Sequence, residues 1–588
     1  MDTGSLNYQW SLSIIHAYVL SGVVNAVISP GSRSTPLTLA CARHPDIKTW
    51  VQVDERSAAF FALGLAIKSQ QPVILICTSG SAVANWLPAV VEANYSQVPL
   101  ILLSADRPVE LQDCGANQTI DQQYLFGSHV RAFHALPEPS EMLLNNMYLP
   151  QLIARTSLQM QQPLAGPVHL NIPFREPLLP LAENLNERVD ALTRAVSGQH
   201  KAVYSRPRQL AASQEDISAI AEVIGRNLGV IVLGRMSYSS TFAETLNQLA
   251  EKLDVPVLVD HLSNLRFGKH KKTNYIVNYD LFLRLYKQEN LLDTAPVWII
   301  RFGQFPVSKA LGEYLRGCAD AVSIVVNDDT RRLDPLLTAN YFIQSSAEGF
   351  CHRLLQRVTA NETCHELLSS FREFDGRSAA VINSTLQQQT IFEGHIISML
   401  IEKIVDSSFI FTSNSTMVRA LDMFTLLNEF SSKTITLYCN RGASGIDGNL
   451  STYLGLLADN RNATGVALLG DLAFFHDMNG LVFCDDLNAE GYSGTIIIIN
   501  NNGGHIFNYL PHHELQEFEK YWLTPIKMDL SSAADMYGLR YQDADSVETL
   551  NQALENSLGS SGIDIIEVFI DQQNSLASHE LLLHDLDD

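Results

Sequence analysis

The stretch from residue 465 to residue 504 constrains the fold more than any other part of the chain. It contains two short apolar runs rich in β-branched residues, at 466–469 and 495–499, separated by an apolar segment of helix length. Such runs are typical of strands buried on both faces of a parallel sheet, with the helix as the crossover between them. The sequence therefore predicts a strand, helix, strand unit of an open α/β sheet.

Polar residues follow both of these runs. Gly470-Asp471 comes after the first, and the segment from Asn500 to Gly503 comes after the second. Ligands of open α/β sheets bind beyond the carboxyl ends of the strands, so these residues are expected to face one another. Carboxylate, amide and carbonyl oxygens suit Mg²⁺, whose octahedral shell is completed by phosphate oxygens and water. The pattern indicates a Mg²⁺-diphosphate site, although ordinary turn chemistry explains these residues equally well when they are taken alone.

The whole chain alternates strand and helix patterns in three blocks. The predicted strands are 26–29, 49–53, 73–77 and 99–103, then 230–233, 255–259, 297–300 and 322–326, then 409–412, 434–439, 466–469, 495–499 and 564–570. We therefore predict an α/β protein of three doubly wound parallel-sheet domains at 1–185, 209–358 and 390–588. Residues 183–208 are polar and expected to be irregular, and residues 1–23 are expected to form an amphipathic helix rather than a signal peptide.

The first and third blocks contain a weak internal repeat. Residues 73–108 and 466–504 both run strand, glycine-containing turn, helix, strand and polar end. Two similar sheets flanking a different one limit the candidate architectures considerably.

Composition excludes several classes of protein. A formal net charge of −23 argues against nucleic acid or an anionic membrane as the main partner. No apolar run is long enough to span a bilayer. The eight cysteines are scattered singly without a C-x-x-C pair, which favours reduced thiols in a cytoplasmic protein over disulfides or a zinc site.

Several longer motifs resemble those of thiamine diphosphate enzymes, and in particular the bacterial 2-succinyl-5-enolpyruvyl-6-hydroxy-3-cyclohexene-1-carboxylate synthases of menaquinone biosynthesis. The resemblance covers most of the chain and is weakest in the middle block. Its motifs are SPGSRSTPL from Ser29, VDERSAAFFALG from Val53, TSGSAVAN from Thr78, SADRPVELQDCGANQTIDQ from Ser104, SNSTMVRALD from Ser413, NRGASGIDGNLST from Asn440, GDLAFFHDMNGL from Gly470 and NNNGG from Asn500. It implies pyrimidine-binding, middle and diphosphate-binding domains in that order.

The resemblance also implies a cofactor site. Glu55 would hydrogen-bond N1′ of the aminopyrimidine, and Ile446 would wedge the cofactor into its bent form. Asp471, Asn501 and the carbonyl of Gly503 would hold Mg²⁺, or Mn²⁺ in its place, with Asn502 and Gly504 as the second choice. The full set of implied cofactor contacts is Glu55, Ser415, Ile446, Asp471, Leu472, Asn501, Gly503 and Ile506.

The implied reaction is carboligation by a transferase. The enzyme would decarboxylate 2-oxoglutarate on thiamine diphosphate and add the four-carbon carbanion to isochorismate in a 1,4 sense. Such anionic substrates call for guanidinium, hydroxyl and amide donors. The implied pocket consists of Ser32, Arg33, Arg107, Gln118, Lys309, Ser415, Arg419 and Arg441, of which Ser32, Arg33, Gln118, Arg419 and Arg441 join Glu55 as the catalytic set. Arg107 suits a structural ion pair equally well.

The family plan also implies a homodimer at least, and we expect a homotetramer, because the pyrimidine domain of one subunit serves the diphosphate domain of another. The alternatives are another thiamine diphosphate carboligase of the acetolactate synthase type, a non-catalytic scaffold with the same fold, and a flavin or nicotinamide protein. The last lacks the G-x-G-x-x-G fingerprint.

Two features depart from the simplest expectation. The family often has Lys-Arg where this chain has Lys309-Ala310, so one cation of the middle domain is missing. His505, His512 and His513 lie near the metal motif, but their spacing does not match a closed zinc site.

Overall fold

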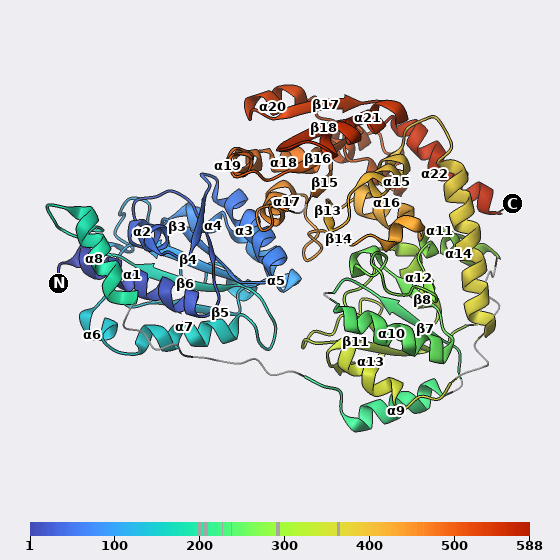
Figure 1. Ribbon diagram of the computed structural model, residues 1–588, viewed down its shortest axis with the longest axis horizontal. Coiled ribbons are helices and arrows are strands. Elements are labelled where there is room, and N and C mark those ends of the chain that lie inside the picture. Colours follow the sequence, from blue (N-terminus) through green and yellow to red (C-terminus); the bar gives the residue numbers. More distant parts are fainter. Residues whose placement is uncertain are drawn as a thin grey trace. The chain divides into compact units, whose positions relative to one another are not determined.

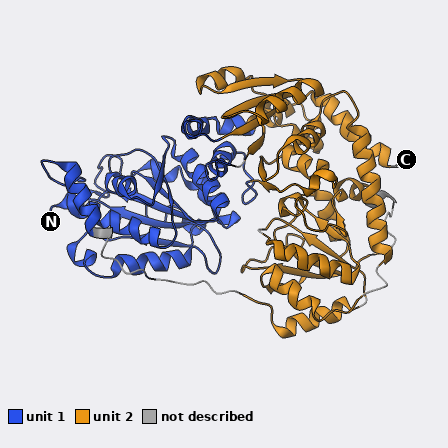
Figure 2. Cartoon of the chain, in the orientation of Figure 1, with its two compact units in different colours: residues 1–208, 440–462, 473–492 blue, residues 209–439, 463–472, 493–588 orange. Residues whose placement is uncertain are grey.

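The computed structural model describes residues 1–197, 203, 210–225, 227–236, 238–289, 295–360, 365–462 and 464–587 (Figure 1). The chain divides into two compact units (Figure 2). Unit 1 comprises Met1–Arg208, Asn440–Asn462 and Ala473–Tyr492. Unit 2 comprises Gln209–Cys439, Ala463–Leu472 and Ser493–Asp588.

In the part of the chain that the structure describes, three parallel sheets of six strands form the framework, which confirms the predicted fold class. The first, in unit 1, has the order β2-β1-β3-β4-β6-β5. Its strands are β1 Asn25–Ile28, β2 Lys48–Val51, β3 Val73–Cys77, β4 Leu100–Asp106, β5 Ala132–Ala135 and β6 Val168–Pro173. The central strands are buried along their length, as expected where helices cover both faces.

The other two sheets belong to unit 2. The second has the order β12-β11-β10-β7-β8-β9, with strands β7 Gly229–Leu233, β8 Val257–Val259, β9 Tyr275–Ile276, β10 Trp298–Phe302, β11 Val322–Asn327 and β12 Ala339–Gln344. The third has the order β14-β13-β15-β16-β18-β17, with strands β13 Ser408–Thr412, β14 Ile435–Tyr438, β15 Gly465–Gly470, β16 Gly494–Asn500, β17 Arg540–Ala544 and β18 Ile563–Phe569.

The first and third sheets share one strand order, so the predicted internal repeat is confirmed. β3 and β4 occupy the same places in the first sheet as β15 and β16 in the third. The middle sheet follows the Rossmann order, in which the chain starts at the centre and works outward in both directions.

Helices cover the sheets of each unit. Those of unit 1 are α1 Thr3–Leu20, α2 Thr35–Arg43, α3 Glu55–Ser69, α4 Ser81–Ala84, α5 Leu87–Ser96, α6 Glu141–Leu144, α7 Tyr148–Gln159, α8 Leu185–Ser197, α17 Asn449–Leu457 and α19 Phe483–Ala489. Those of unit 2 are α9 Gln214–Ile224, α10 Ser240–Leu253, α11 Tyr279–Glu289, α12 Lys309–Gly317, α13 Ala347–Leu355, α14 His365–Thr385, α15 Glu393–Lys403, α16 Thr416–Phe424, α20 Leu530–Met536, α21 Val547–Leu558 and α22 Gln572–Asp587. A short helix, α18 Asp471–His476, starts in unit 2 and ends in unit 1.

The strands that sequence reasoning missed lie mostly at sheet edges. β5, β12 and β17 are edge strands whose residues are mostly exposed or half-buried, so they carry no apolar run to reveal them. β6 is buried, but its sequence, VHLNIP, mixes polar residues with apolar ones and ends in proline.

Two local expectations were wrong. Residues 3–20 do form a helix, but α1 is buried on several faces and is not amphipathic, because α2, α7 and α8 all pack against it. The segment 183–208 was expected to be irregular, yet its first part is helix α8. Residues 198–202 and 204–208 of that segment lie outside the described residues.

Helices α3 and α17 approach each other closely within unit 1. A Cβ on Gly64 would lie 2.0 Å from the carbonyl oxygen of Thr452, and one on Gly455 would lie 2.1 Å from that of Phe61. Neither backbone atom can move aside cheaply, so glycine is required at both positions. The close contact fixes the helix that begins at Glu55.

Among the described residues, we find no helix that combines the length and the apolar character needed to cross a membrane.

Candidate active site

Three of the predicted pocket residues come together in unit 1 beyond the ends of β1, β3 and β4. The Arg107 guanidinium donates to the carbonyl of Gln118 at 2.6 Å, and the Gln118 amide donates to the carbonyl of Ser79 at 3.0 Å. Burial lowers the pKa of Arg107, and the charge of Arg33 lowers it further. Arg33 and Arg107 therefore face the same region, as a pocket for carboxylates requires.

Arg33 is buried and already has protein partners. It donates to the carbonyl of Phe174 at 2.9 Å and forms an ion pair with Glu176 at 2.9 Å. A guanidinium has five N–H donors, so these two contacts leave capacity for a ligand. Ser32, beside it, is exposed.

A buried polar network that sequence reasoning missed supports this cluster. Gln122 accepts from the N–H of Gly80 at 2.9 Å and donates to the carbonyl of Ala105 and to Asn171. Asn171 in turn donates to Asp106 at 2.7 Å. Burial raises the pKa of Asp106. The network ties together the turns that follow β3 and β4 and so holds Arg107 in place.

Glu55 is the first residue of α3 and is half-buried. The preceding residue, Asp54, caps the helix by accepting from the N–H groups of Arg56 and Ser57. The amide of Asn85 donates to the Glu55 carboxylate at 3.4 Å. Burial and the nearby Glu55 charge both raise the pKa of Cys77, so the carboxylate lies near the carboxyl end of β3.

Asp477 fixes the start of α3 against α17. Its fully buried carboxylate accepts from the backbone and hydroxyl of Ser451 at 2.7 and 3.0 Å and from the hydroxyl of Ser57 at 3.2 Å. Ser57 lies two residues after Glu55. Burial raises the pKa of Asp477 to about 6, although these hydrogen bonds act in the opposite direction.

Glu92 holds the loop that carries Arg441 and Ile446. This buried carboxylate on α5 accepts from the N–H groups of Gly442 and Ala443, each at 2.7 Å. Ile446 is 44% exposed, so it is not a core residue and is available for the expected contact with the cofactor, although an ordinary loop isoleucine could be equally exposed. The signal for Glu92 was a single acid inside the apolar helix segment LPAVVEANYS.

In unit 2 the turns after β15 and β16 are in contact, as their strand order requires. Asp471 is buried and accepts from the N–H of Leu472 at 2.7 Å and from that of Gly503 at 2.8 Å. Burial raises the pKa of Asp471, while these N–H groups favour the charged form. A carboxylate against the backbone of Gly503 suits a cation site.

The backbone of the NNNGG segment is tightly specified. Gly503 has φ of 130°, and a Cβ there would lie 2.3 Å from the carbonyl oxygen of Leu523, so the position requires glycine. The Gly503 carbonyl accepts from the N–H of His505 at 2.9 Å and keeps a second lone pair.

The three asparagines differ in what they contact. The Asn500 amide donates to the buried Glu567 at 2.5 Å, and its oxygen accepts from the N–H of Asn502 at 3.1 Å. Glu567 also accepts from the hydroxyl of Tyr541 at 2.5 Å. Both polar atoms of the Asn500 side chain are thus used in hydrogen bonds within the protein. Asn501 is half-buried and Asn502 is exposed with φ of 63°.

The donor set fits a hard divalent cation. The Asp471 carboxylate and the backbone of Gly503 are adjacent, and the Asn501 amide and the Gly503 carbonyl supply further oxygens. Among the described residues, the histidines near this motif belong to no group of three metal-ligating side chains. A zinc site formed by these histidines is therefore not supported.

Ser415, Arg419 and Lys309 are the predicted substrate contacts of unit 2. Ser415 precedes α16 with a φ of 67° and a ψ of −130°, and its carbonyl accepts from the exposed Arg419 at 2.5 Å. The Lys309 side chain is 85% exposed and lies 3.8 Å from Glu313. Ala310, where the family often has arginine, is buried in the apolar core. Leu472 and Ile506 are half-buried near the metal motif.

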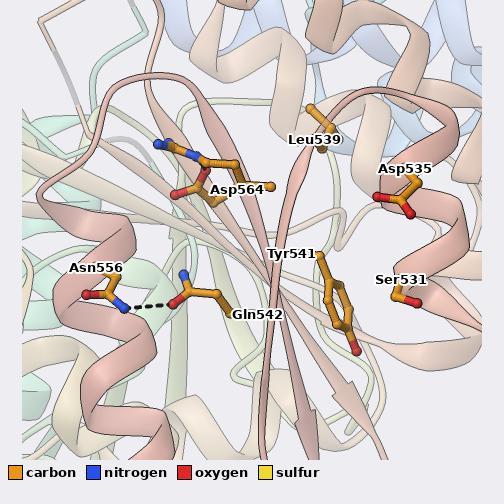
Figure 3. A pocket seen from close by; sticks show the side chains of 8 residues that line it. Ser531, Asp535, Leu539, Tyr541, Gln542, Asn556 and Asp564 are labelled. Atoms are coloured by element: carbon orange, nitrogen blue, oxygen red, sulfur yellow. Dashed lines mark hydrogen bonds and ion pairs between the residues drawn. The ribbon is translucent and has the colours of Figure 1, made fainter.

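A separate open pocket of about 530 Å³ lies near the amino ends of β17 and β18 (Figure 3). Its lining includes Asp564, whose carboxylate accepts from Arg540 at 2.6 Å, and Gln542, which accepts from Asn556 at 2.9 Å. The predicted ligand residues follow the opposite, carboxyl ends of the strands, so this pocket contains none of them.

Comparison with known proteins finds two matching thiamine pyrophosphate families and similar synthases of nearly the same length. Residues 13–125 match the family "Thiamine pyrophosphate enzyme, N-terminal TPP binding domain", and residues 198–411 match "Middle domain of thiamine pyrophosphate". The chain is 39% identical to the 2-succinyl-5-enolpyruvyl-6-hydroxy-3-cyclohexene-1-carboxylate synthase of Geobacillus kaustophilus, over 98% of this chain and 97% of the relative. It is also 39% identical to the synthase of the same name from Dechloromonas aromatica, over 96% and 99%.

A similar fold occurs in the crystal structure of benzoylformate decarboxylase from Polynucleobacter necessarius. The TM-score is 0.69 at 17% identity, over 97% of this chain and 99% of that one.

The titration of Asp477 gives a test of how α3 is held. Its folded pKa of about 6 lies above the unfolded value of about 3.9, so the folded state binds more protons between pH 4 and pH 6. The carboxylate therefore costs stability as the pH rises through this window, by up to about 2–3 kcal/mol. Relative to an Asp477→Asn variant, we expect the Tm of the wild type to fall between pH 4 and pH 7 in thermal scans.

Asp485→Asn is the matched control, because Asp485 is an exposed carboxylate of the same unit. Its Tm difference from the wild type should be flat over this range. A flat difference for Asp477→Asn as well would contradict the assignment.

Proposed function

The chain belongs to the family of 2-succinyl-5-enolpyruvyl-6-hydroxy-3-cyclohexene-1-carboxylate synthases, and on this premise we propose that it catalyses the synthesis of that compound in menaquinone biosynthesis. In the proposed reaction 2-oxoglutarate loses CO₂, and the remaining four-carbon unit adds to isochorismate in a 1,4 sense. The observation that carries the proposal is the similarity to these synthases over nearly the whole chain.

The three sheets suit the domain plan of the family. We assign residues 1–185 to the pyrimidine-binding domain, 209–358 to the middle domain and 390–588 to the diphosphate-binding domain. The first matched family falls inside the first of these ranges, and the second includes the whole middle range and extends beyond both of its ends.

Thiamine diphosphate would supply the electron sink that decarboxylation requires. Glu55 would hold the proton shared with N1′ of the pyrimidine, since its carboxylate lies at the carboxyl edge of the first sheet. The exposed Ile446 would press against the rings, and Leu472 and Ile506 would line the cleft.

Asp471, Asn501 and the Gly503 carbonyl would hold Mg²⁺ or Mn²⁺ at the diphosphate. The half-buried position of Asn501 favours it over the exposed Asn502, which with the Gly504 carbonyl remains the second choice.

The pocket for the anionic substrates would combine residues from several loops. Arg33 and Arg107 share one region of unit 1, and Arg419 is exposed on α16 of unit 2. Guanidinium groups bind carboxylates bidentately, while the neutral donors orient them. We assign this role to Ser32, Arg33, Arg107, Gln118, Lys309, Ser415, Arg419 and Arg441.

We further propose a homodimer at least, and a homotetramer as the complete assembly, in which Glu55 of one chain and Asp471 of another serve the same cofactor. We also assign the enzyme to the cytoplasm. Six of the seven described cysteines are buried, which suits reduced thiols in a reducing compartment.

The direct test of function supplies the purified protein with thiamine diphosphate, Mg²⁺, 2-oxoglutarate and isochorismate. We expect CO₂ release together with loss of isochorismate, and neither when 2-oxoglutarate is replaced by pyruvate. Consumption of pyruvate without consumption of 2-oxoglutarate would instead indicate an enzyme of the acetolactate synthase type.

The metal assignment predicts the effect of removing its carboxylate. Asp471→Ala should weaken Mg²⁺-dependent binding of thiamine diphosphate, measured by calorimetry, by at least about tenfold, because the charged ligand is lost. Asn501→Ala should weaken it more than Asn502→Ala if Asn501 is the amide ligand. Unchanged cofactor affinity in Asp471→Ala would refute the metal site.

A further inference from the structure

A fully buried ionic cluster in unit 2 links the middle sheet to helix α16. Its centre is Asp422 on α16, which accepts from Arg266 at 2.5 Å, from His261 at 3.0 Å and from the hydroxyl of Tyr279 at 3.4 Å. Arg266 and His261 have no exposed surface, and Asp422 is 2% exposed. Asp422 ends the SNSTMVRALD motif, but the sequence assigned it no role, because its three partners lie more than 140 positions away along the chain.

Arg266 also caps the end of α16. Its guanidinium donates to the carbonyls of Asp422 and Thr425 at 2.5 and 3.3 Å, and its Nε donates to the carbonyl of Val259 at 2.8 Å. The last carbonyls of a helix lack partners within the helix, and a cation there also opposes the negative end of the helix dipole. A single side chain thus joins the end of β8 to the end of α16.

A metal does not suit this cluster, although Asp260, His261 and Asp422 lie close enough together to hold one. Asp260 already accepts from the N–H groups of Leu262 and Val307, at 2.8 and 2.7 Å. The charge of Asp422 is already paired with Arg266. A cation would have to displace a guanidinium and two backbone donors, so the residues form an ion-pair network.

Folding stability alone does not explain this buried ion-pair network. Buried ion pairs gain little over apolar residues of similar size, because both charges lose their hydration. In the described part of the chain, Asp422 Oδ2 and His261 Nε2 are buried without a hydrogen-bond partner, which adds a further cost. The cluster does fix the orientation of one helix, α16.

The held helix carries two of the proposed substrate contacts. Arg419 lies one turn before Asp422 on α16, and Ser415 immediately precedes the helix. At about 1.5 Å per residue, a helix of 9 residues is roughly 14 Å long, so fixing its end fixes the position and rotation of its start. Arg419 is exposed whereas Asp422 is buried, which separates the contact residue from the holding residue.

We propose that Arg266 and Asp422 are positioning residues, which set the place of Arg419 and Ser415 for substrate binding and so give the middle domain a role in the reaction. This inference rests on the proposed function, because it needs Arg419 to contact a substrate carboxylate. In this proposal, the ion-pair network couples the middle sheet to the contact between Arg419 and the substrate.

The test is a double-mutant cycle on the holoenzyme, with cofactor and Mg²⁺ saturating. Arg419→Ala, Asp422→Asn and the double variant are compared by kcat and KM for each substrate. We expect Asp422→Asn to raise the KM of the same substrate as Arg419→Ala, by roughly tenfold, with a smaller change in kcat. The double variant should be less impaired than the product of the two single effects, because both changes act on the Arg419 contact.

The matched control is Asp334→Asn. Asp334, in the loop between β11 and β12, forms another buried ion pair of the same unit, with Arg301 of β10 at 3.4 Å. The other side-chain hydrogen bonds of the pair go to Leu333, Thr338 and Ala339, none of which is on α16. This variant should lower stability and leave KM unchanged for the folded enzyme. If Asp422→Asn fails to fold, Arg266→Lys replaces it, since the lysine keeps the charge but cannot contact the carboxylate and two carbonyls together.

Independent effects that multiply in the double variant would overturn the proposal, as would a KM unchanged in Asp422→Asn. An Arg419→Ala variant with wild-type kinetics would overturn it too. The reaction itself is judged separately, by whether the wild-type protein consumes both substrates, so the failure of one claim is distinguishable from the failure of the other.

Discussion

A parallel sheet whose two faces are covered by helices can present polar groups to a ligand only at the edge where its strands end. This constraint applies in both units. The interior strands β3, β4, β15 and β16 are almost wholly buried, so they cannot present polar side chains to a ligand from their faces. All strands of a parallel sheet end at the same edge, and the polar loops that follow them collect there. The contact between Asp471 and Gly503 in unit 2 is a direct result, as is the contact between Arg107 and Gln118 in unit 1.

Buried acids fix the loops and helices at these edges. Asp477 binds the start of α17, Glu92 binds two N–H groups of the loop after Arg441, and Asp422 binds an arginine that caps α16. Each acid is buried and accepts hydrogen bonds from donors in a distant part of the chain. Each therefore fixes the orientation of the segment it contacts as well as its position. Arg441 and Arg419, which we expect to contact small anions, thus lie on segments that buried carboxylates hold in place.

Local chemistry made much of this predictable from the sequence. Interior strands carry continuous apolar runs, and turns after them carry glycine and polar residues, so β3, β15 and the Asp471 turn were evident. The repeat was visible because both outer sheets use the same strand order. Edge strands such as β12 were missed because exposed positions impose no apolar pattern.

The supporting residues could not be predicted for a different reason. Asp422 meets Arg266 at a separation of 156 residues, and Glu92 meets Gly442 at 350, so neither pair leaves a periodic or local signal. The one-residue ambiguity at Asn501 is also spatial, because Asn500, Asn501 and Asn502 are identical in sequence and differ only in burial and partners.

The central claim is that Glu55 and Asp471 serve one cofactor, with each site drawing on two chains. Co-expression of Glu55→Gln and Asp471→Ala chains with different tags, followed by purification of the mixed dimer, tests this directly. Each variant alone should be inactive, whereas the mixed dimer should regain one intact site of its two and turn over 2-oxoglutarate and isochorismate. A mixed dimer as inactive as its parents would contradict the account, because a site built within one chain cannot be restored in this way.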